Sequence, residues 1–223
     1  MIKDSDYHIK NEYIDGETNW VWPNKDLESL DGGLWLGPKN EWPKSKELII
    51  KHCSSFQSVV QAGGACGMYP RLMSKMFETV YTFEPHLENF FALVNNCKNP
   101  NIYKYQAALA NGHQMISLNS PSPNMGMHTI YSHLIDKQFD YIPTLMIDDF
   151  QFYKLSLIYL DIEHSEIYAL KGAAKNIVWH KPLIVTENAT KEIVDFLSNL
   201  GYIIVDKNVN DTFFKLKLFE LFT

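Results

Sequence analysis

The stretch V-V-Q-A-G-G-A-C-G, from Val59 to Gly67, decides how this chain folds. Its first half is apolar, as in a buried strand, and three glycines follow within five positions. Glycine lets the backbone turn sharply and approach a ligand, and the N-terminus of a following helix presents free N–H groups. The stretch predicts a strand, a glycine-rich turn and a helix, which suits a nucleotide-like ligand, although such a turn can also be purely structural.

A second signal stands at Glu84, which ends the next apolar run, 20 residues after Gly64. At this spacing in a βαβ unit an acidic side chain reaches the hydroxyls of a ribose. A carboxylate there can accept two hydrogen bonds from a cis-diol. The alternative is a solvated carboxylate at a strand end.

Outward from this stretch, short apolar runs alternate with amphipathic segments, which is the pattern of a parallel sheet covered by helices. The expected strands are Ser58–Ala62, Val80–Glu84, Ile102–Gln106, Leu157–Asp161 and Leu183–Glu187. The expected helices are Lys44–His52, Tyr69–Phe77, Leu87–Asn96, Ser165–Val178 and Thr190–Leu200. After Gly201, the runs YIIVD and TFFKLKL around the turn NVND predict a final β-hairpin.

The composition narrows the function classes. The chain has 223 residues, of which 46% are hydrophobic and 21% charged, as in a globular protein with one sizeable core. A net charge of -6 disfavours nucleic acid as a partner. Three scattered cysteines offer no disulfide framework and no metal-ligand spacing, which favours a cytoplasmic location. No apolar segment of ~20 residues occurs, so we expect no membrane partner.

Four of the five tryptophans, Trp20, Trp22, Trp35 and Trp42, stand near the N-terminus. Tryptophans at this density either cap a hydrophobic core or wall a substrate pocket. We expect residues 1–52 to form an N-terminal extension that packs on a core domain of residues 53–223.

The ordered set of motifs resembles the FkbM-type family of S-adenosylmethionine-dependent methyltransferases, from about Ser58 to Leu218. The motifs are VVQAGGACGMY, VYTFEPHLENFFAL, NIYKYQAALAN, the segment Asn124-Met125-Gly126, TLMIDDF, LIYLDIEHSEIYALKGA and PLIVTEN. The resemblance implies an α/β, Rossmann-like class I methyltransferase fold: a mostly parallel seven-stranded sheet with a C-terminal antiparallel hairpin, here with the Trp-rich N-terminal extension. It also implies transfer of a methyl group from S-adenosylmethionine, often to a hydroxyl oxygen of a small molecule or sugar.

The resemblance further implies the residues around the cofactor. Carried over by position, they are Gln61, Gly63, Gly64, Ala65, Gly67, Glu84, Pro85, His86, Ala107, Ala108 and Asp161. Two positions depart from the family pattern. Gln61 stands where an acidic residue is usual, so it supplies no charge to the cofactor's ammonium group. His164-Ser165 stands where glycine and a small residue are usual.

The chemical end of the site is expected beyond the fourth and fifth strands, because ligands of open α/β sheets lie outside the carboxyl ends of the strands. Asp161, Glu163 and His164 are the candidate catalytic residues, with Glu163 or His164 as general base. Glu163 and Glu166 could instead be helix N-terminal acids that the helix dipole stabilises. Asn124, in the loop from Ser120 to Tyr141, and Glu187 are the candidate substrate residues.

Several alternatives stay open at this stage. An acid after the fourth strand together with Glu187-Asn188 after the fifth also resembles the oxygen ligands of Mg²⁺-dependent O-methyltransferases, although the family resemblance does not itself require a metal. A nicotinamide-dependent oxidoreductase would use the same glycine turn and Glu84, but Ala62 replaces the first glycine of GxGxxG. A nucleic-acid methyltransferase would carry a proline-aromatic motif, which LDIEHSE lacks. A catalytically silent binding module is the remaining rival, and the oligomeric state is left open.

Overall fold

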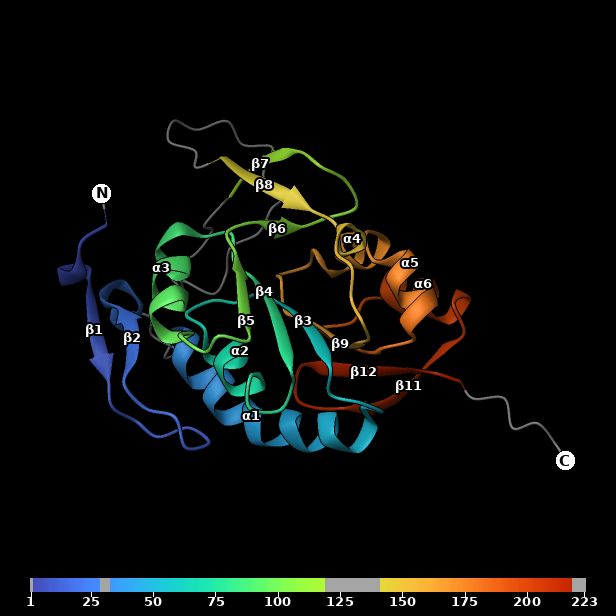
Figure 1. Cartoon of the computed structure of the whole chain (residues 1–223), viewed down its shortest axis with the longest axis horizontal. Helices are drawn as coiled ribbons and strands as arrows, with labels where there is room; N and C mark the ends of the chain where they lie inside the picture. Colours follow the sequence, from blue (N-terminus) through green and yellow to red (C-terminus); the bar gives the residue numbers. More distant parts are fainter. Residues whose placement is uncertain (1, 29–32, 119–140, 218–223) are drawn as a thin grey trace, which may run out of the picture.

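The computed structural model describes residues 2–28, 33–118 and 141–217, and a seven-stranded sheet forms its centre (Figure 1). The strand order across this sheet is β11-β12-β10-β9-β3-β4-β5. The strands are β3 (Ser58–Ala62), β4 (Thr79–Phe83), β5 (Ile102–Tyr105), β9 (Leu155–Leu160), β10 (Leu183–Glu187), β11 (Tyr202–Lys207) and β12 (Asp211–Leu216). Each of the five strands expected between residues 58 and 187 is confirmed, and their ends differ from expectation by two residues at most.

The C-terminal hairpin is also confirmed, with one refinement. The last strand, β12, runs antiparallel to both β10 and β11, whereas β10, β9, β3, β4 and β5 pair in parallel. Because β11 is antiparallel to β12, it has the same direction as the rest of the sheet. The mixed sheet therefore contains a single reversed strand, which lies between β10 and β11.

Six helices cover the two faces of the sheet within the described residues (Figure 1). Buried side chains of α1, α2 and α3 pack on one face, and those of α4, α5 and α6 pack on the other. The helices are α1 (Gly33–His52), α2 (Met68–Met73), α3 (Leu87–Asn96), α4 (Glu166–Lys171), α5 (Ala174–His180) and α6 (Lys191–Asn199). Strands β3, β9 and β10 contribute fully buried residues to both faces, as their near-continuous apolar runs require.

Three expected helices differ in extent. The helix expected at Tyr69–Phe77 ends at Met73, because the Asn101 side chain donates to the carbonyls of Ser74 (2.9 Å) and Phe77 (3.0 Å) and closes a turn there. The helix expected at Ser165–Val178 is divided into α4 and α5 at Gly172, where a Cβ atom would lie 2.0 Å from the Ala110 carbonyl oxygen. The helix expected at Lys44–His52 is the second half of the longer α1.

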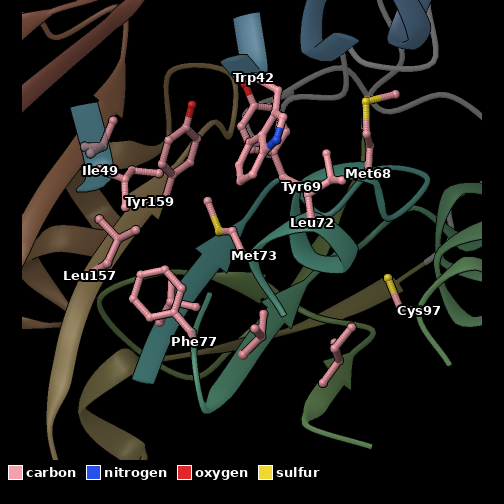
Figure 2. Close-up of a cluster of buried hydrophobic side chains, with 14 of the residues drawn as sticks. Trp42, Ile49, Met68, Tyr69, Leu72, Met73, Phe77, Cys97, Leu157 and Tyr159 are labelled. Atoms are coloured by element: carbon pink, nitrogen blue, oxygen red, sulfur yellow. The ribbon is translucent and has the colours of Figure 1, made fainter. Parts of the chain in front are cut away.

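The N-terminal extension packs its tryptophans inward. After a short 3-10 helix, η1 (Asp4–Asp6), strands β1 (Tyr7–Lys10) and β2 (Trp20–Pro23) form an antiparallel pair, and η2 (Asn24–Glu28) precedes α1. Trp20, Trp22 and Trp42 are each at most 1% exposed. Figure 2 shows the Trp42 ring beside Tyr69 within the buried cluster, at 5.4 Å between ring centroids. These three tryptophans cap the core. The division into an extension and a core domain stays a prediction.

A three-stranded sheet lies beyond β5. It has the order β6-β8-β7, with β6 (Ala108–Leu109) parallel and β7 (Met115–Ser117) antiparallel to β8 (Tyr141–Leu145). The 3-10 helix η3 (Ile147–Asp149) connects β8 toward β9. This sheet lies beside the carboxyl ends of β4 and β5 (Figure 1).

Candidate active site

The glycine turn lies at the carboxyl end of β3 and has the unusual backbone that its sequence predicts. Gly63, Ala65 and Gly67 have positive φ angles of 81°, 44° and 89°. The Gly64 N–H donates to the Phe83 carbonyl at 2.9 Å, which fastens the turn to the end of β4. A Cβ atom on Gly64 would lie 2.5 Å from the Leu93 side chain and 2.8 Å from the Thr82 hydroxyl oxygen, so a larger residue here would require these side chains to shift.

The Glu84 carboxylate lies directly beside this turn. One oxygen accepts the Ala65 N–H and the other accepts the His86 N–H, each at 2.7 Å. The side chain is 5% exposed, and this burial raises the pKa of Glu84 to about 7. The Asn89 side chain also hydrogen-bonds this carboxylate. A carboxylate has about four acceptor positions, so Glu84 keeps acceptor capacity for a hydroxyl of a diol.

Gln61 lies beneath the turn with its amide engaged inside the protein. Its Oε1 accepts the Thr82 hydroxyl at 2.7 Å, and its Nε2 donates to the Gly63 carbonyl at 2.9 Å. The residue is 1% exposed. Gln61 therefore braces the turn against β4, a role that the sequence did not indicate.

The remaining residues expected at the adenosine follow β4 and β5. Pro85 and His86 are half-buried, immediately after Glu84. Ala107 and Ala108 are 3% and 5% exposed at the junction of β5 with the small sheet. All four lie at the same edge of the central sheet as the glycine turn. Asn124, the other candidate substrate residue besides Glu187, lies outside the described residues.

Three carboxylates meet where β9 and β10 end. Asp161, Glu163 and Glu187 each have a carboxylate oxygen within 4.8 Å of the others, and oxygen ligands at this spacing suit a hard cation such as Mg²⁺. Burial, and then the hydrogen-bonded neighbour Glu187, hold the pKa of Asp161 well above its usual range. Burial and the charge of Glu187 raise the pKa of Glu163 to about 7. Glu163 can therefore gain or lose a proton near neutral pH.

Glu163 and Glu166, which follow β9, were each considered as helix N-terminal acids, and Glu163 also as a general base. The structure gives the two residues different surroundings. Glu166 accepts the Ile162 N–H at 2.9 Å and is 3% exposed, as expected of an acid at a helix start. Glu163 and His164 instead have left-handed φ angles of 50° and 71°, and Glu163 is directed to the carboxylate group. The φ angle of His164 agrees with the glycine that the family pattern has there.

Further polar side chains of this site come from α1 and β12, and they were not predicted from the sequence. Asp211, at the start of β12, is the antiparallel register partner of Glu187. Its Oδ2 accepts the hydroxyls of Tyr159 (2.6 Å) and Ser45 (3.0 Å). Glu41, one turn before Ser45 on α1, accepts Asn210 Nδ2 at 3.2 Å. Burial and the charges of Asp211 and Glu187 raise the pKa of Glu41 to about 7.

The sequence analysis expected Asp211 in the turn NVND of the final hairpin, whereas in the structure it is the first residue of β12. Its place beside Glu187 was therefore not predicted. Glu41 and Ser45 had no signal either, because nothing in the sequence says which face of the helix meets the sheet.

Comparison with known proteins identifies the family of the chain. The family model of the methyltransferase FkbM domain matches residues 72–204. The chain belongs to this family.

The chain is also similar to solved structures. A crystal structure of methyltransferase FkbM from Methylobacillus flagellatus KT is 21% identical with a TM-score of 0.50, covering 73% of this chain and 44% of that one. The chain thus spans less than half the length of that FkbM structure. The N-methyltransferase NodS from Bradyrhizobium japonicum is 10% identical with a TM-score of 0.48, covering 82% and 100% of the two chains. A search of curated proteins finds no match.

The class I methyltransferase fold expected from the sequence is therefore confirmed for this FkbM domain. The sheet order and the single reversed strand come from the register of the strands, and the family match and the similarity to the FkbM structure are consistent with this fold. The individual roles of the site residues stay predictions.

Proposed function

We propose that this FkbM domain transfers the methyl group of S-adenosylmethionine to a hydroxyl oxygen of a small molecule or sugar. The proposal rests on one observation: a group that can bind a ribose and a group that can accept a proton lie at the same edge of the sheet. A buried carboxylate beside a glycine turn offers acceptors to a ribose, and a group of carboxyl side chains, which includes Glu163 with a pKa of about 7, follows β9 and β10. A nicotinamide dinucleotide would use the turn but has no need of those carboxyl groups.

Acidic residues of the chain suit the positive charge of the cofactor, as Glu84 suits its ribose hydroxyls. S-adenosylmethionine supplies an electrophilic methyl group on a positively charged sulfur. Asp161, Glu187 and Asp211 lie close together between the glycine turn and α1, and burial and neighbouring acids raise the pKa of Asp161 and of Asp211. A bound cation would favour the ionised form of these two carboxyl groups. Gln61 adds no charge, so we assign the attraction of the cofactor's positive end to Asp161 rather than to the position that is usually acidic.

Methyl transfer to a hydroxyl requires alignment and the removal of one proton. Glu163 is the residue we assign to this proton, because its pKa of about 7 leaves a large fraction of the carboxylate free near neutral pH. Its carboxylate accepts the acceptor's hydroxyl proton at Oε1 or Oε2. His164 is exposed beside it and can pass a proton to solvent. We expect Glu187, which belongs to the same carboxylate group, and Glu41, whose pKa the charge of Glu187 raises, to hydrogen-bond the acceptor.

The proposal is tested first by binding. Calorimetric titration with S-adenosylhomocysteine should show one site, whereas NADH should show none. Glu84→Ala should weaken binding by roughly tenfold to a hundredfold, because two hydrogen bonds are worth ~1–3 kcal/mol. Binding of NADH, or unchanged affinity in the variant, would contradict the cofactor assignment.

The acceptor is tested separately. The protein is incubated with methyl-labelled S-adenosylmethionine and a panel of sugars, other alcohols and amines, and the labelled products are identified by mass spectrometry. Label on a hydroxyl oxygen supports the proposal, and label on nitrogen contradicts it. A protein that binds the cofactor but labels no compound would favour the silent binding module.

A further inference from the structure

An exposed apolar patch lies on the opposite edge of the sheet from the candidate active site. Trp179 and Val178, on α5, are 82% and 60% exposed, and Tyr153, in the segment before β9, is 95% exposed. A shallow groove of about 630 Å³ is lined by Ala174, Lys175, Val178, Trp179 and Lys181. We call Tyr153, Lys175, Val178, Trp179 and Lys181 the α5 patch.

The position of the patch follows from the chain path. Lys181 precedes β10 and Tyr153 precedes β9, so the patch lies at the amino ends of these strands. The Lys154 Nζ donates to the His180 carbonyl at 2.9 Å, which joins the two segments. The candidate active site lies at the carboxyl ends of the same strands, so the patch and the site do not overlap.

The charged groups of the patch are cationic. Within the part of the chain that the structure describes, no carboxylate lies within ion-pair distance of Lys175 or Lys181. Two acids of η3, Asp148 and Asp149, precede α5, and the charge of Lys175 is among the causes that lower the pKa of Asp149. Asp148 accepts the N–H groups of Lys175 and Asn176, and Asp149 accepts from His113.

We propose that the α5 patch docks the protein on an anionic lipid surface. Tryptophan and tyrosine favour the membrane interface, where the ring is apolar and its polar atom stays hydrated, and lysine is attracted to anionic headgroups. No described helix is long and apolar enough to cross a membrane, so the contact is peripheral. This proposal departs from the expectation of no membrane partner, which rested on the lack of a spanning segment.

Charge also argues against a second copy of the chain as the occupant. A symmetric dimer would bring the same patch of both copies together, so Lys175 and Lys181 would face their own equivalents. Lysine is moreover depleted from protein interfaces, whereas aromatic residues with lysines at the rim suit lipid headgroups. The cations therefore favour a partner that carries dense negative charge.

The experiment is cosedimentation of the full chain with vesicles of phosphatidylcholine alone or mixed with phosphatidylserine. Binding should require phosphatidylserine and weaken with salt. Trp179→Ala and Lys175→Glu should each weaken it by at least about fivefold, the effect of one lost lysine contact. The matched controls are Tyr13→Ala, at a side chain 77% exposed in the extension, and Lys98→Glu, at an exposed lysine after α3. Both should bind like the parent.

Two outcomes would overturn the proposal. Equal sedimentation with both vesicle types, or patch variants that bind like the parent, would show that the patch does not recognise anionic lipid. A dimer seen by light scattering without vesicles, and converted to a monomer by Trp179→Ala, would assign the patch to self-association instead. Brominated lipids give a second readout, because quenching of tryptophan fluorescence should be lost in Trp179→Phe even where binding is retained.

Discussion

Gly63 and Asp161 are packed so closely that a Cβ atom on Gly63 would lie 1.8 Å from the Asp161 carbonyl oxygen. No side chain can be accommodated at that distance, and the φ angle of 81° at Gly63 favours glycine independently. The Asp161 N–H also donates to the Ala62 carbonyl at 3.1 Å. The turn beside Glu84 and the carboxylate group after β9 are thus held together through one backbone contact.

We expect Gly63→Ala to be strongly destabilising for this reason. The free energy of unfolding should fall by about 2–4 kcal/mol, the sum of overpacking and of a left-handed residue with a Cβ. Chemical denaturation measures the change. Gly112→Ala is the matched control, since a Cβ on Gly112 would meet nothing within 4 Å. Equal stability of the two variants would contradict the close contact.

The second prediction concerns Gln61, whose side-chain amide joins the glycine turn to β4. The variant is Gln61→Glu. The family pattern has an acid here, but in this chain the new carboxylate would face the Gly63 carbonyl, which now accepts from Gln61 Nε2. A buried, unpaired charge should lower the free energy of unfolding by about 1–3 kcal/mol at pH 8. The loss should be smaller at pH 5, where a protonated carboxyl can donate to that carbonyl.

The control for this variant is Gln151→Glu, at an exposed position before β9, where stability should hardly change. If Gln61→Glu is as stable as the parent at pH 8 and binds S-adenosylhomocysteine more tightly, residue 61 contacts the cofactor directly. The hydrogen bonds of Gln61 to the turn and to β4 would then contribute little to stability.

Much of the fold could be predicted from the sequence because its signals are local. The apolar runs of β3 and β10 are bounded by turns, and both strands have the limits that the sequence indicated. The first half of α1 was not predictable in this way. Pro38 and Pro43 lie inside it, and proline within a helix usually costs ~3 kcal/mol. Burial of Trp42 and Ile49 against the core offsets that cost.

In the candidate site, too, some residues could be predicted from local sequence signals and others could not. Asp161, Glu163 and Glu187 could be expected together because they follow neighbouring strands of one sheet. The hydroxyls that Asp211 accepts could not, because Tyr159 and Ser45 come from a strand interior and from α1. Their meeting depends on how the extension packs, which is a tertiary property.

The third prediction concerns pH and Glu84. The pKa of this carboxyl is about 7 when folded, against an ordinary value of 4.5, and burial is the main cause. Between these values the folded protein holds a proton that the unfolded chain has released. Stability must therefore fall as the pH rises from about 4.5 to about 7, by ~3 kcal/mol for this group.

Glu84→Gln tests this assignment, because an amide does not titrate. The difference in the free energy of unfolding between pH 5 and pH 8, measured in urea, should shrink by a large part of that amount. Glu41 and Glu163, whose pKa values are also about 7, leave a remainder of the same sign. A variant that keeps the parent's full pH dependence would show that Glu84 is ionised throughout.

The fourth prediction concerns the proton acceptor, and rests on the proposed function. Glu163→Gln should lower turnover by ~10²–10⁴ with little change in cofactor affinity, as expected for loss of a general base. Asp161→Asn should lower both, since its partner is the cofactor's positive end. Glu192→Gln, at an exposed carboxylate paired with Lys171, is the control and should behave like the parent. Parent-like turnover in Glu163→Gln would leave alignment as the main source of catalysis.

The last prediction distinguishes two effects of His164: the strain of its backbone and any proton transfer by its imidazole. This residue has a φ angle of 71°, which glycine adopts freely and histidine does not, and its side chain is exposed. His164→Gly should therefore raise the free energy of unfolding by up to about 1 kcal/mol, whereas His164→Ala keeps the strained backbone and should not. Both variants lack the imidazole. If His164 carries protons away from Glu163, the two variants should lose turnover equally despite their different stabilities, and the loss should be greatest in weakly buffered solution. If His164→Gly is more stable and as active as the parent, the histidine is tolerated at this corner and takes no part in the reaction.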